Sequence, residues 1–93
     1  MFRVIFSKNF IKAARRLEHS GKFKQKEVDD VLILLASECS VPAIYRDHSL
    51  KGDLLGLREC HVRGDILLIY RKDYDTLILL AINIGTHHEL FRT

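Results

Sequence analysis

Five histidines are spread along this chain of 93 residues, and an imidazole can take up or release a proton near neutral pH. Two of them stand side by side within Gly85–Phe91, directly after a long apolar run. Together with the carboxylate of Asp65, such rings have two chemical uses: paired general acid and general base, or ligands of a metal ion. They could also be scattered surface side chains. The histidines are His19, His48, His61, His87 and His88.

Three consecutive strands are predicted in the C-terminal half, and they decide which of these residues can meet. The first strand alternates in side-chain type, which puts Glu59 and His61 on one face. The other two are apolar on both faces, as is typical of strands that are covered on both sides. Turn signals at Arg63–Asp65 and Asp73–Asp75 are short, and short connections imply antiparallel neighbours. The predicted strands cover residues 57–62, 66–72 and 76–84.

This meander brings three strand ends to one rim of the sheet. The end of its first strand, the start of its second and the end of its third lie side by side, so we expect His61, Asp65 and His87 to converge there. His48 lies in residues 40–56, which have no clear period and are predicted to be mostly loop with a short extended piece. This loop could fold His48 over the rim.

The N-terminal half predicts the elements that support the sheet. Phe2–Phe6 is a short strand, and a helix with Ser7 as its cap and Gly21 near its end follows. A second helix carries an apolar stripe over residues 28–35. His19 ends the first helix, where a cation suits the helix dipole, and we expect its role to be structural or neutral. The order predicts an α+β fold in one domain, residues 1–93: a small antiparallel sheet with an N-terminal strand and a two-helix hairpin packed on it.

Composition narrows the class of protein without deciding the function. Hydrophobic residues make up 47% of the chain, enough for a folded core, and no apolar stretch is long enough to span a membrane. We therefore expect a cytoplasmic protein in which Cys39 and Cys60 are reduced and packed as small apolar groups. The net charge is only +3, but seven basic residues crowd into positions 8–26. This cluster could attract a polyanion or form a solvated helical face.

A more specific pattern lies in "RDHSLKGDLLGLRECHVRGDILLIY" and "INIGTHHELF". It contains Asp-His-x-Leu-x-Gly, Gly-x-Arg-x-x-His, Asp-x-Leu-Leu-Ile-Tyr and Gly-Thr-His-x-x-Leu-Phe in this order. Over Asp47–Phe91, about half of the chain, the sequence resembles the YafQ branch of the RelE/ParE toxin superfamily. The resemblance implies the toxin of a type II toxin–antitoxin pair, which cleaves mRNA in the ribosomal A site and stops translation. It also implies a cognate antitoxin as partner and no metal or organic cofactor.

Carried over position by position, the resemblance implies catalytic roles for His48, His61, Asp65 and His87. His87 directly follows Gly-Thr, whereas His88 occupies a variable position. We expect His48 to act as the base and His87 as the acid. His61 would orient the phosphate, and Asp65 would fix a histidine tautomer.

The resemblance also implies a substrate contact at Phe91, whose ring would stack on an RNA base. The alternative is that this ring only pins the C-terminus to the core. Many relatives carry an arginine where this chain has Asn83. We therefore expect another basic residue to supply the positive charge that an arginine at this position would bring to the substrate. The candidates are Lys51, Arg58 and Arg63.

Three other functions compete with the ribonuclease. One is a ParE-like toxin that poisons gyrase without cutting RNA, although such toxins generally lack this histidine set. Another is a metal-dependent hydrolase in which His48, His61, His87 and Asp65 are ligands. The last is an RNA-binding module that uses the basic helical face.

Overall fold

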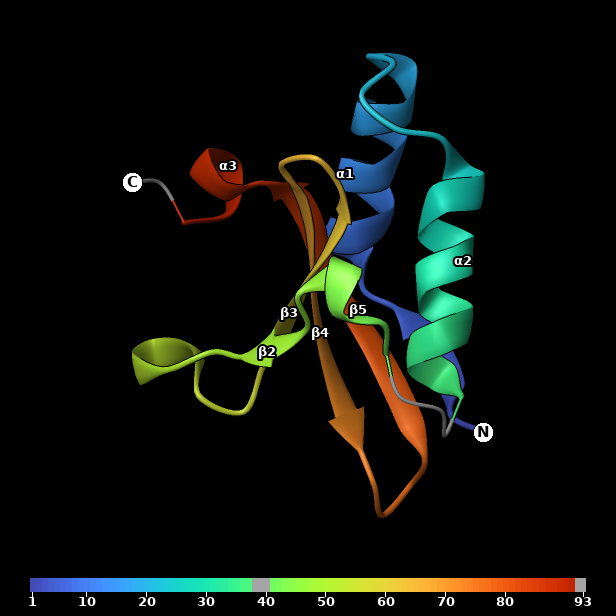
Figure 1. Ribbon diagram of the computed structural model, residues 1–93, viewed down its shortest axis with the longest axis vertical. Coiled ribbons are helices and arrows are strands. Elements are labelled where there is room, and N and C mark those ends of the chain that lie inside the picture. Colours follow the sequence, from blue (N-terminus) through green and yellow to red (C-terminus); the bar gives the residue numbers. More distant parts are fainter. Residues whose placement is uncertain (38–40, 92–93) are drawn as a thin grey trace.

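A five-stranded mixed sheet forms the centre of the computed structural model, which describes residues 1–37 and 41–91. Helices α1 (Lys8–His19) and α2 (Gln25–Ala36) pack on one side of the sheet, and α3 (His87–Phe91) lies across the sheet from α2 (Figure 1). The strands, in the spatial order β1-β5-β4-β3-β2, are β1 (Arg3–Phe6), β5 (Ile78–Thr86), β4 (Ile66–Asp73), β3 (Arg58–Arg63) and β2 (His48–Ser49). Two 3-10 turns, η1 (Ala43–Tyr45) and η2 (Gly52–Leu54), flank β2.

The α+β class, the helical hairpin and the three-strand meander are confirmed, and the purely antiparallel sheet is not. β1 pairs with β5 in parallel, with Val4 opposite Leu79. Tight turns force antiparallel pairing only within the meander, whereas the helical hairpin between β1 and β3 leaves the direction of β1 open. Of the helices in the described ranges, none is long and apolar enough to cross a membrane.

Helix α1 begins and ends where its capping residues predict. The Ser7 hydroxyl oxygen accepts a hydrogen bond from the Phe10 amide at 3.0 Å, and it donates to the Ile82 carbonyl of β5 at 2.5 Å. The helix stops before Gly21, whose φ of 77° suits a residue without a β-carbon. Ser7 thus fixes the start of α1 to the central part of the sheet. The helix buries Phe10, Ala13, Ala14 and Leu17.

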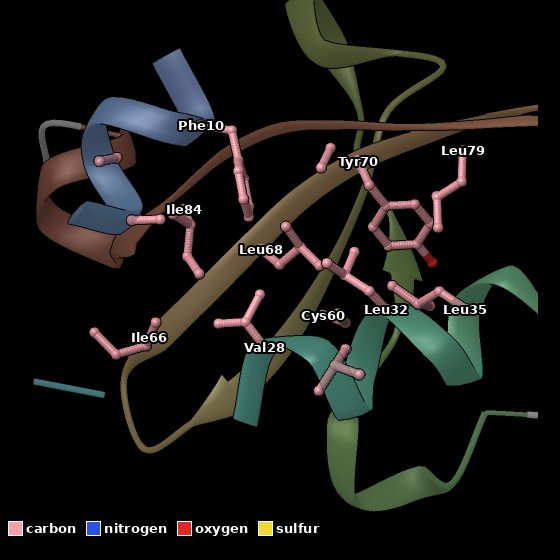
Figure 2. Packing of buried hydrophobic residues seen from close by; sticks show 14 of the residues in the cluster. Phe10, Val28, Leu32, Leu35, Cys60, Ile66, Leu68, Tyr70, Leu79 and Ile84 are labelled. Atoms are coloured by element: carbon pink, nitrogen blue, oxygen red, sulfur yellow. The ribbon is translucent and has the colours of Figure 1, made fainter. Parts of the chain in front are cut away.

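The core fills the space between the sheet and the two long helices, as Figure 2 shows. Leu68 and Tyr70 of β4 are fully buried there beside Leu35 of α2. Burying one such side chain contributes about 1.5–3 kcal/mol relative to leaving it in water. Cys60 lies in the same layer, and burial raises the pKa of its thiol to about 12. The prediction of a reduced, apolar cysteine is therefore confirmed for Cys60, whereas Cys39 lies outside the described residues.

A polar cluster at the edge of this core fastens the residue that precedes β2. The buried Tyr70 hydroxyl donates a hydrogen bond to the Asp47 carboxylate. The Nε of Arg58 donates to the same carboxylate oxygen at 3.2 Å and to the Tyr70 oxygen at 3.3 Å. Burial, followed by the Asp47 hydrogen bond, raises the pKa of Tyr70, so the phenol stays protonated and remains a donor. Asp47 therefore ties the start of β2 to both β3 and β4.

We predict that Asp47→Ala lowers the free energy of unfolding by about 1–3 kcal/mol, because the buried Tyr70 hydroxyl loses its acceptor. Urea denaturation measures the change. Asp53→Ala is the matched control, because Asp53 is exposed in η2 and should change stability by less than about 0.5 kcal/mol. Equal stability of the two variants would contradict an anchoring role for Asp47.

Candidate active site

The strand register brings three strand ends to one rim, as the sequence predicts. Ile66, the first residue of β4, pairs with Arg63 of β3 on one side and Thr86 of β5 on the other. Leu67 likewise lies between His61 and Gly85. The end of β3, the start of β4 and the end of β5 are therefore neighbours.

His61 and Asp65 both lie at this rim but do not contact each other. The His61 Nδ1 is 3.4 Å from the Gly64 carbonyl oxygen. A hydrogen on Nδ1 would donate to that carbonyl and leave Nε2 with a free lone pair. Asp65 is exposed in the β3–β4 turn, and none of the described residues hydrogen-bonds or ion-pairs with its carboxylate.

His48 approaches the same face of the sheet from β2, the short extended piece of the predicted loop. It pairs with Glu59 of β3, and its Nε2 lies 3.5 Å from the Glu59 Oε2. The Nδ1 lies 3.2 Å from the Ser49 carbonyl oxygen. Because residues i and i+2 of a strand share a face, Glu59 and His61 both point away from the core that holds Cys60. His48, Glu59 and His61 therefore line one surface.

Glu59 is the residue that the sequence-based site prediction missed. It is only 6% exposed, whereas the side chain of His48 beside it is 54% exposed. A buried carboxylate needs a partner, and His48 is its ion-pair partner in the described ranges. The contact is a salt bridge only when the imidazole is protonated. The sequence did contain a signal for Glu59, because the alternation of residues 57–62 places it on the same face of the strand as His61.

His87 reaches the rim as the first residue of α3. Its exposed ring packs against Phe91 with 4.8 Å between centroids and an interplanar angle of 42°. Phe91 is half-buried, so one ring face supports His87 while part of the side chain remains accessible. His88, the next residue, is exposed as well.

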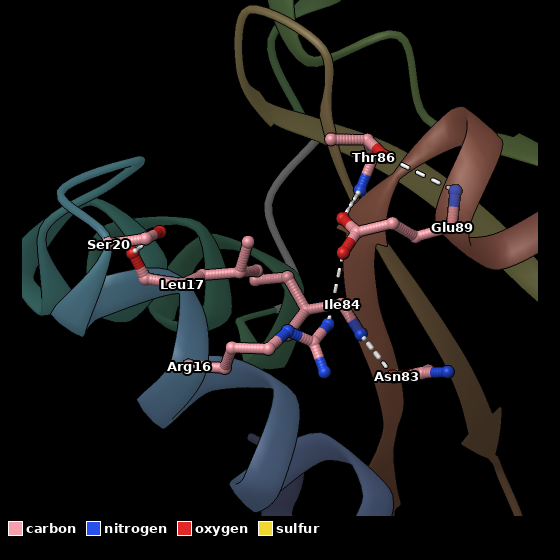
Figure 3. A network of polar contacts seen from close by, with 7 residues as sticks. All are labelled: Arg16, Leu17, Ser20, Asn83, Ile84, Thr86 and Glu89. Atoms are coloured by element: carbon pink, nitrogen blue, oxygen red, sulfur yellow. Dashed lines mark hydrogen bonds and ion pairs between the residues drawn. The ribbon is translucent and has the colours of Figure 1, made fainter.

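The start of α3, which the sequence did not predict, is held by reciprocal hydrogen bonds (Figure 3). The Thr86 hydroxyl accepts from the Glu89 amide at 3.2 Å, and the Glu89 Oε1 accepts from the Thr86 amide at 2.9 Å. Arg16 of α1 donates to the other Glu89 oxygen at 3.1 Å. The Thr86 amide is the main cause that lowers the pKa of Glu89, so the carboxylate stays ionised. A β-carbon at Gly85 would lie 3.3 Å from Glu89, which shows how closely α3 packs on β5.

Of the three basic residues predicted to bind substrate, two are exposed and one is held on the helix side of the sheet. Arg63 is exposed near His61 at the end of β3, with its Nη1 3.4 Å from Glu27 of α2. Lys51 is exposed just before η2. Arg58 points to the helix side of the sheet with Tyr70 and forms an ion pair with Asp47. The hydrogen bond to Asp47 raises the pKa of the Arg58 guanidinium. The structure therefore does not bring Arg58 to the histidines.

Asn83, at the position where many relatives carry an arginine, turns its side chain to the backbone. Its Oδ1 accepts a hydrogen bond from the Ile84 amide at 2.9 Å. Across residues 1–37 and 41–91, no group of three His, Cys, Asp or Glu side chains is placed to hold a metal ion. The histidines lie on separate segments, and one of them, His48, has the buried carboxylate of Glu59 beside it.

Residues 2–92 match the family described as "Bacterial toxin of type II toxin-antitoxin system, YafQ". The chain belongs to this family. The mRNA interferase toxin YafQ of Escherichia coli strain K12 is 34% identical over 90 residues, which cover 83% of this chain and 96% of that protein. A protein of Haemophilus influenzae that carries the name YafQ is 35% identical over 60 residues, which cover 60% of this chain and 59% of its own length.

Solved structures of bacterial toxins share the whole fold. A metal-bound toxin from Helicobacter pylori superposes with a TM-score of 0.90 at 37% identity, covering 98% of this chain and 100% of that one. YafQ in the Escherichia coli DinJ–YafQ complex superposes with a TM-score of 0.82 at 28% identity, and the match covers 98% of this chain and 99% of that one. The resemblance inferred from Asp47–Phe91 thus extends over the N-terminal strand and helices.

We predict that His87→Ala lowers RNA cleavage by about 10²–10⁴-fold, the usual cost of losing a proton-transfer group, whereas His88→Ala changes it little. Both rings are exposed neighbours in α3, so the second variant is a matched control for the first. Cleavage of mRNA on programmed ribosomes measures both variants. Similar losses in the two would remove His87 from the catalytic set.

Proposed function

We propose that this YafQ-family protein is an endoribonuclease that cleaves mRNA in the ribosomal A site and thereby stops translation. The observation that carries the proposal is the surface formed by His48, Glu59 and His61, with His87 at the adjoining rim. Relatives named mRNA interferases support the substrate class. In this proposal the protein acts in the cytoplasm, where ribosomes translate.

The proposed reaction needs two proton transfers. The RNA 2′-oxygen attacks the adjacent phosphorus while a base takes up its proton. The bond from phosphorus to the 5′-oxygen breaks, and an acid protonates that leaving oxygen. The products are a 2′,3′-cyclic phosphate and a free 5′-hydroxyl, so atoms and charge balance without any further reactant.

Of His48 and His87, His48 is the better candidate for the base. A base becomes positively charged as it takes the 2′-hydroxyl proton, and the Glu59 carboxylate at 3.5 Å stabilises that charge. Because Glu59 is buried, little water weakens the interaction. Glu59 thus serves as a positioning residue that acts through His48.

His87 is the acid in this scheme, and its ring rests on Phe91. His61 stabilises the phosphoryl oxygens, with its Nδ1 directed to Gly64. The exposed carboxylate of Asp65 orients a histidine once the substrate is bound. Lys51 and Arg63 supply positive charge to the RNA backbone in place of an arginine at Asn83.

A cognate antitoxin is the proposed protein partner. Escherichia coli YafQ forms a complex with DinJ, and this chain shares its fold over 98% of its length. The second candidate function is metal-dependent hydrolysis, favoured by the metal-bound toxin from Helicobacter pylori. In that case His48, His61, His87 and Asp65 would have to move to form one ligand set.

The position of the nucleophile separates these two reactions. We predict that mRNA with a 2′-O-methyl group at the cut site resists cleavage on programmed ribosomes, because its 2′-oxygen cannot attack. The unmodified message should be cut in the presence of chelator, with magnesium returned to keep ribosomes intact. Cleavage of the blocked message at the same bond would instead indicate a metal-activated water.

We predict that Glu59→Gln slows cleavage about tenfold to a hundredfold, less than the ~10²–10⁴-fold cost of losing a proton-transfer group. The amide keeps the shape of the side chain but cannot balance a charged His48. The rate should also respond differently to pH, which a merely structural role would not cause. Glu18→Gln on the exposed surface of α1 is the control. An unchanged pH–rate profile in Glu59→Gln would argue against His48 as the base.

A further inference from the structure

An open hollow of about 410 Å³ lies beside the candidate active site, at the outer edge of β3. β2 covers that edge only at Arg58 and Glu59. Further along β3 no strand of the described ranges pairs with the edge, and η1 stands there instead. The hollow is lined chiefly by Ile44, Tyr45, Arg46, His61 and Arg63.

The lining carries more positive than negative charge. Arg46 is exposed, and none of the described carboxylates forms an ion pair with it. Arg63 has Glu27 3.4 Å away, which offsets part of its charge. A guanidinium group offers several N–H donors in one plane, a geometry that matches phosphate oxygens. His61 borders both this hollow and the catalytic surface, so the two are continuous.

The backbone at Arg46 adds an independent observation. Its φ of 49° and ψ of 43° are left-handed, a conformation in which a side chain with a β-carbon is crowded. Glycine or asparagine would fit this position with less strain, yet the chain has arginine there. Strained residues of this kind cluster where a side chain serves binding or catalysis. The next residue, Asp47, is fixed by Tyr70 and holds Arg46 in place.

We infer that this hollow binds a backbone phosphate of the RNA next to the nucleotides that react, with Arg46 as the principal contact. Ile44 and Tyr45 form an apolar wall, which suits the sugar or base beside that phosphate. A bound phosphate at this edge of β3 would guide the strand toward His61 and His48. The inference rests on the proposed function for its substrate and assigns Arg46 to capture rather than to proton transfer.

The test compares Arg46→Asn with Arg3→Gln. Asparagine tolerates the left-handed backbone, so the first variant loses the guanidinium without added strain. Arg3 is exposed on β1, at the opposite edge of the sheet, and is the matched control. Binding of a short, fully 2′-O-methylated single-stranded RNA is followed by fluorescence anisotropy at several salt concentrations. Cleavage of mRNA on programmed ribosomes gives the half-saturating ribosome concentration and the rate at saturation.

Arg46→Asn should weaken RNA binding about tenfold at low salt and flatten the salt dependence of log K by about 0.7, the value of one phosphate contact on a single strand. It should raise the half-saturating concentration about tenfold and change the rate at saturation less than about twofold. Arg46→Lys should fall between wild type and Arg46→Asn. The control should match wild type in all of these measurements.

Two results would overturn the inference: RNA binding by Arg46→Asn equal to that of Arg3→Gln, or a loss confined to the rate at saturation. The binding assay does not depend on cleavage. If the wild-type protein binds RNA through Arg46 but cuts no message, the proposed ribonuclease fails and the phosphate site stands.

Discussion

The contact between Asp47 and the buried Tyr70 is the interaction on which the surface of His48, Glu59 and His61 depends. β2 has only two residues, and two backbone pairs cannot hold a strand against water. Asp47 supplies the missing constraint, because Tyr70 and Arg58 hold its carboxylate on the helix side of the sheet. Neighbouring residues of an extended chain point to opposite faces, so His48 is directed to the other face and onto Glu59. One anchored residue thereby positions both His48, the proposed base, and the neighbouring Arg46.

The two histidines proposed for proton transfer, His48 and His87, are held in different ways. Buried groups hold His48, whereas α3 carries His87 on a network of exposed or partly exposed groups, Thr86, Glu89 and Arg16. The hydrogen bond from the Thr86 amide holds the folded-state pKa of Glu89 below its unfolded value. The network therefore contributes its full stability above the unfolded pKa and loses it as pH falls through the folded pKa. Acid should loosen the support of His87 through this group, whereas salt weakens its Arg16 contact.

Local signals made much of this structure predictable from sequence. The caps of α1, the apolar stripe of α2 and the alternation of β3 each act within a few residues, and the rim of His61 and His87 follows from short turns alone. The parallel pairing of β1 could not be predicted, because it joins segments more than 70 positions apart. The five residues of α3 are too few to show a helical period, and part of its support comes from Arg16 on a distant helix. Arg58 was expected near the substrate, although the alternation that put His61 on the open face already directed Arg58 to the other.

The placement of His48, His61 and His87 on separate segments fits the proposed acid–base reaction better than a tight cluster would. A metal ion requires ligand atoms at about 2 Å from a single point, so three side chains must converge. Acid–base cleavage requires the opposite: one group beside the 2′-oxygen and another beside the 5′-oxygen, with the phosphate between them. His48 on β2 and His87 on α3 come from separate segments, and His61, the proposed phosphate contact, lies on β3, which pairs with β2. In the proposed function, an RNA strand would lie along this surface of the sheet, with the two proposed proton-transfer groups beside it.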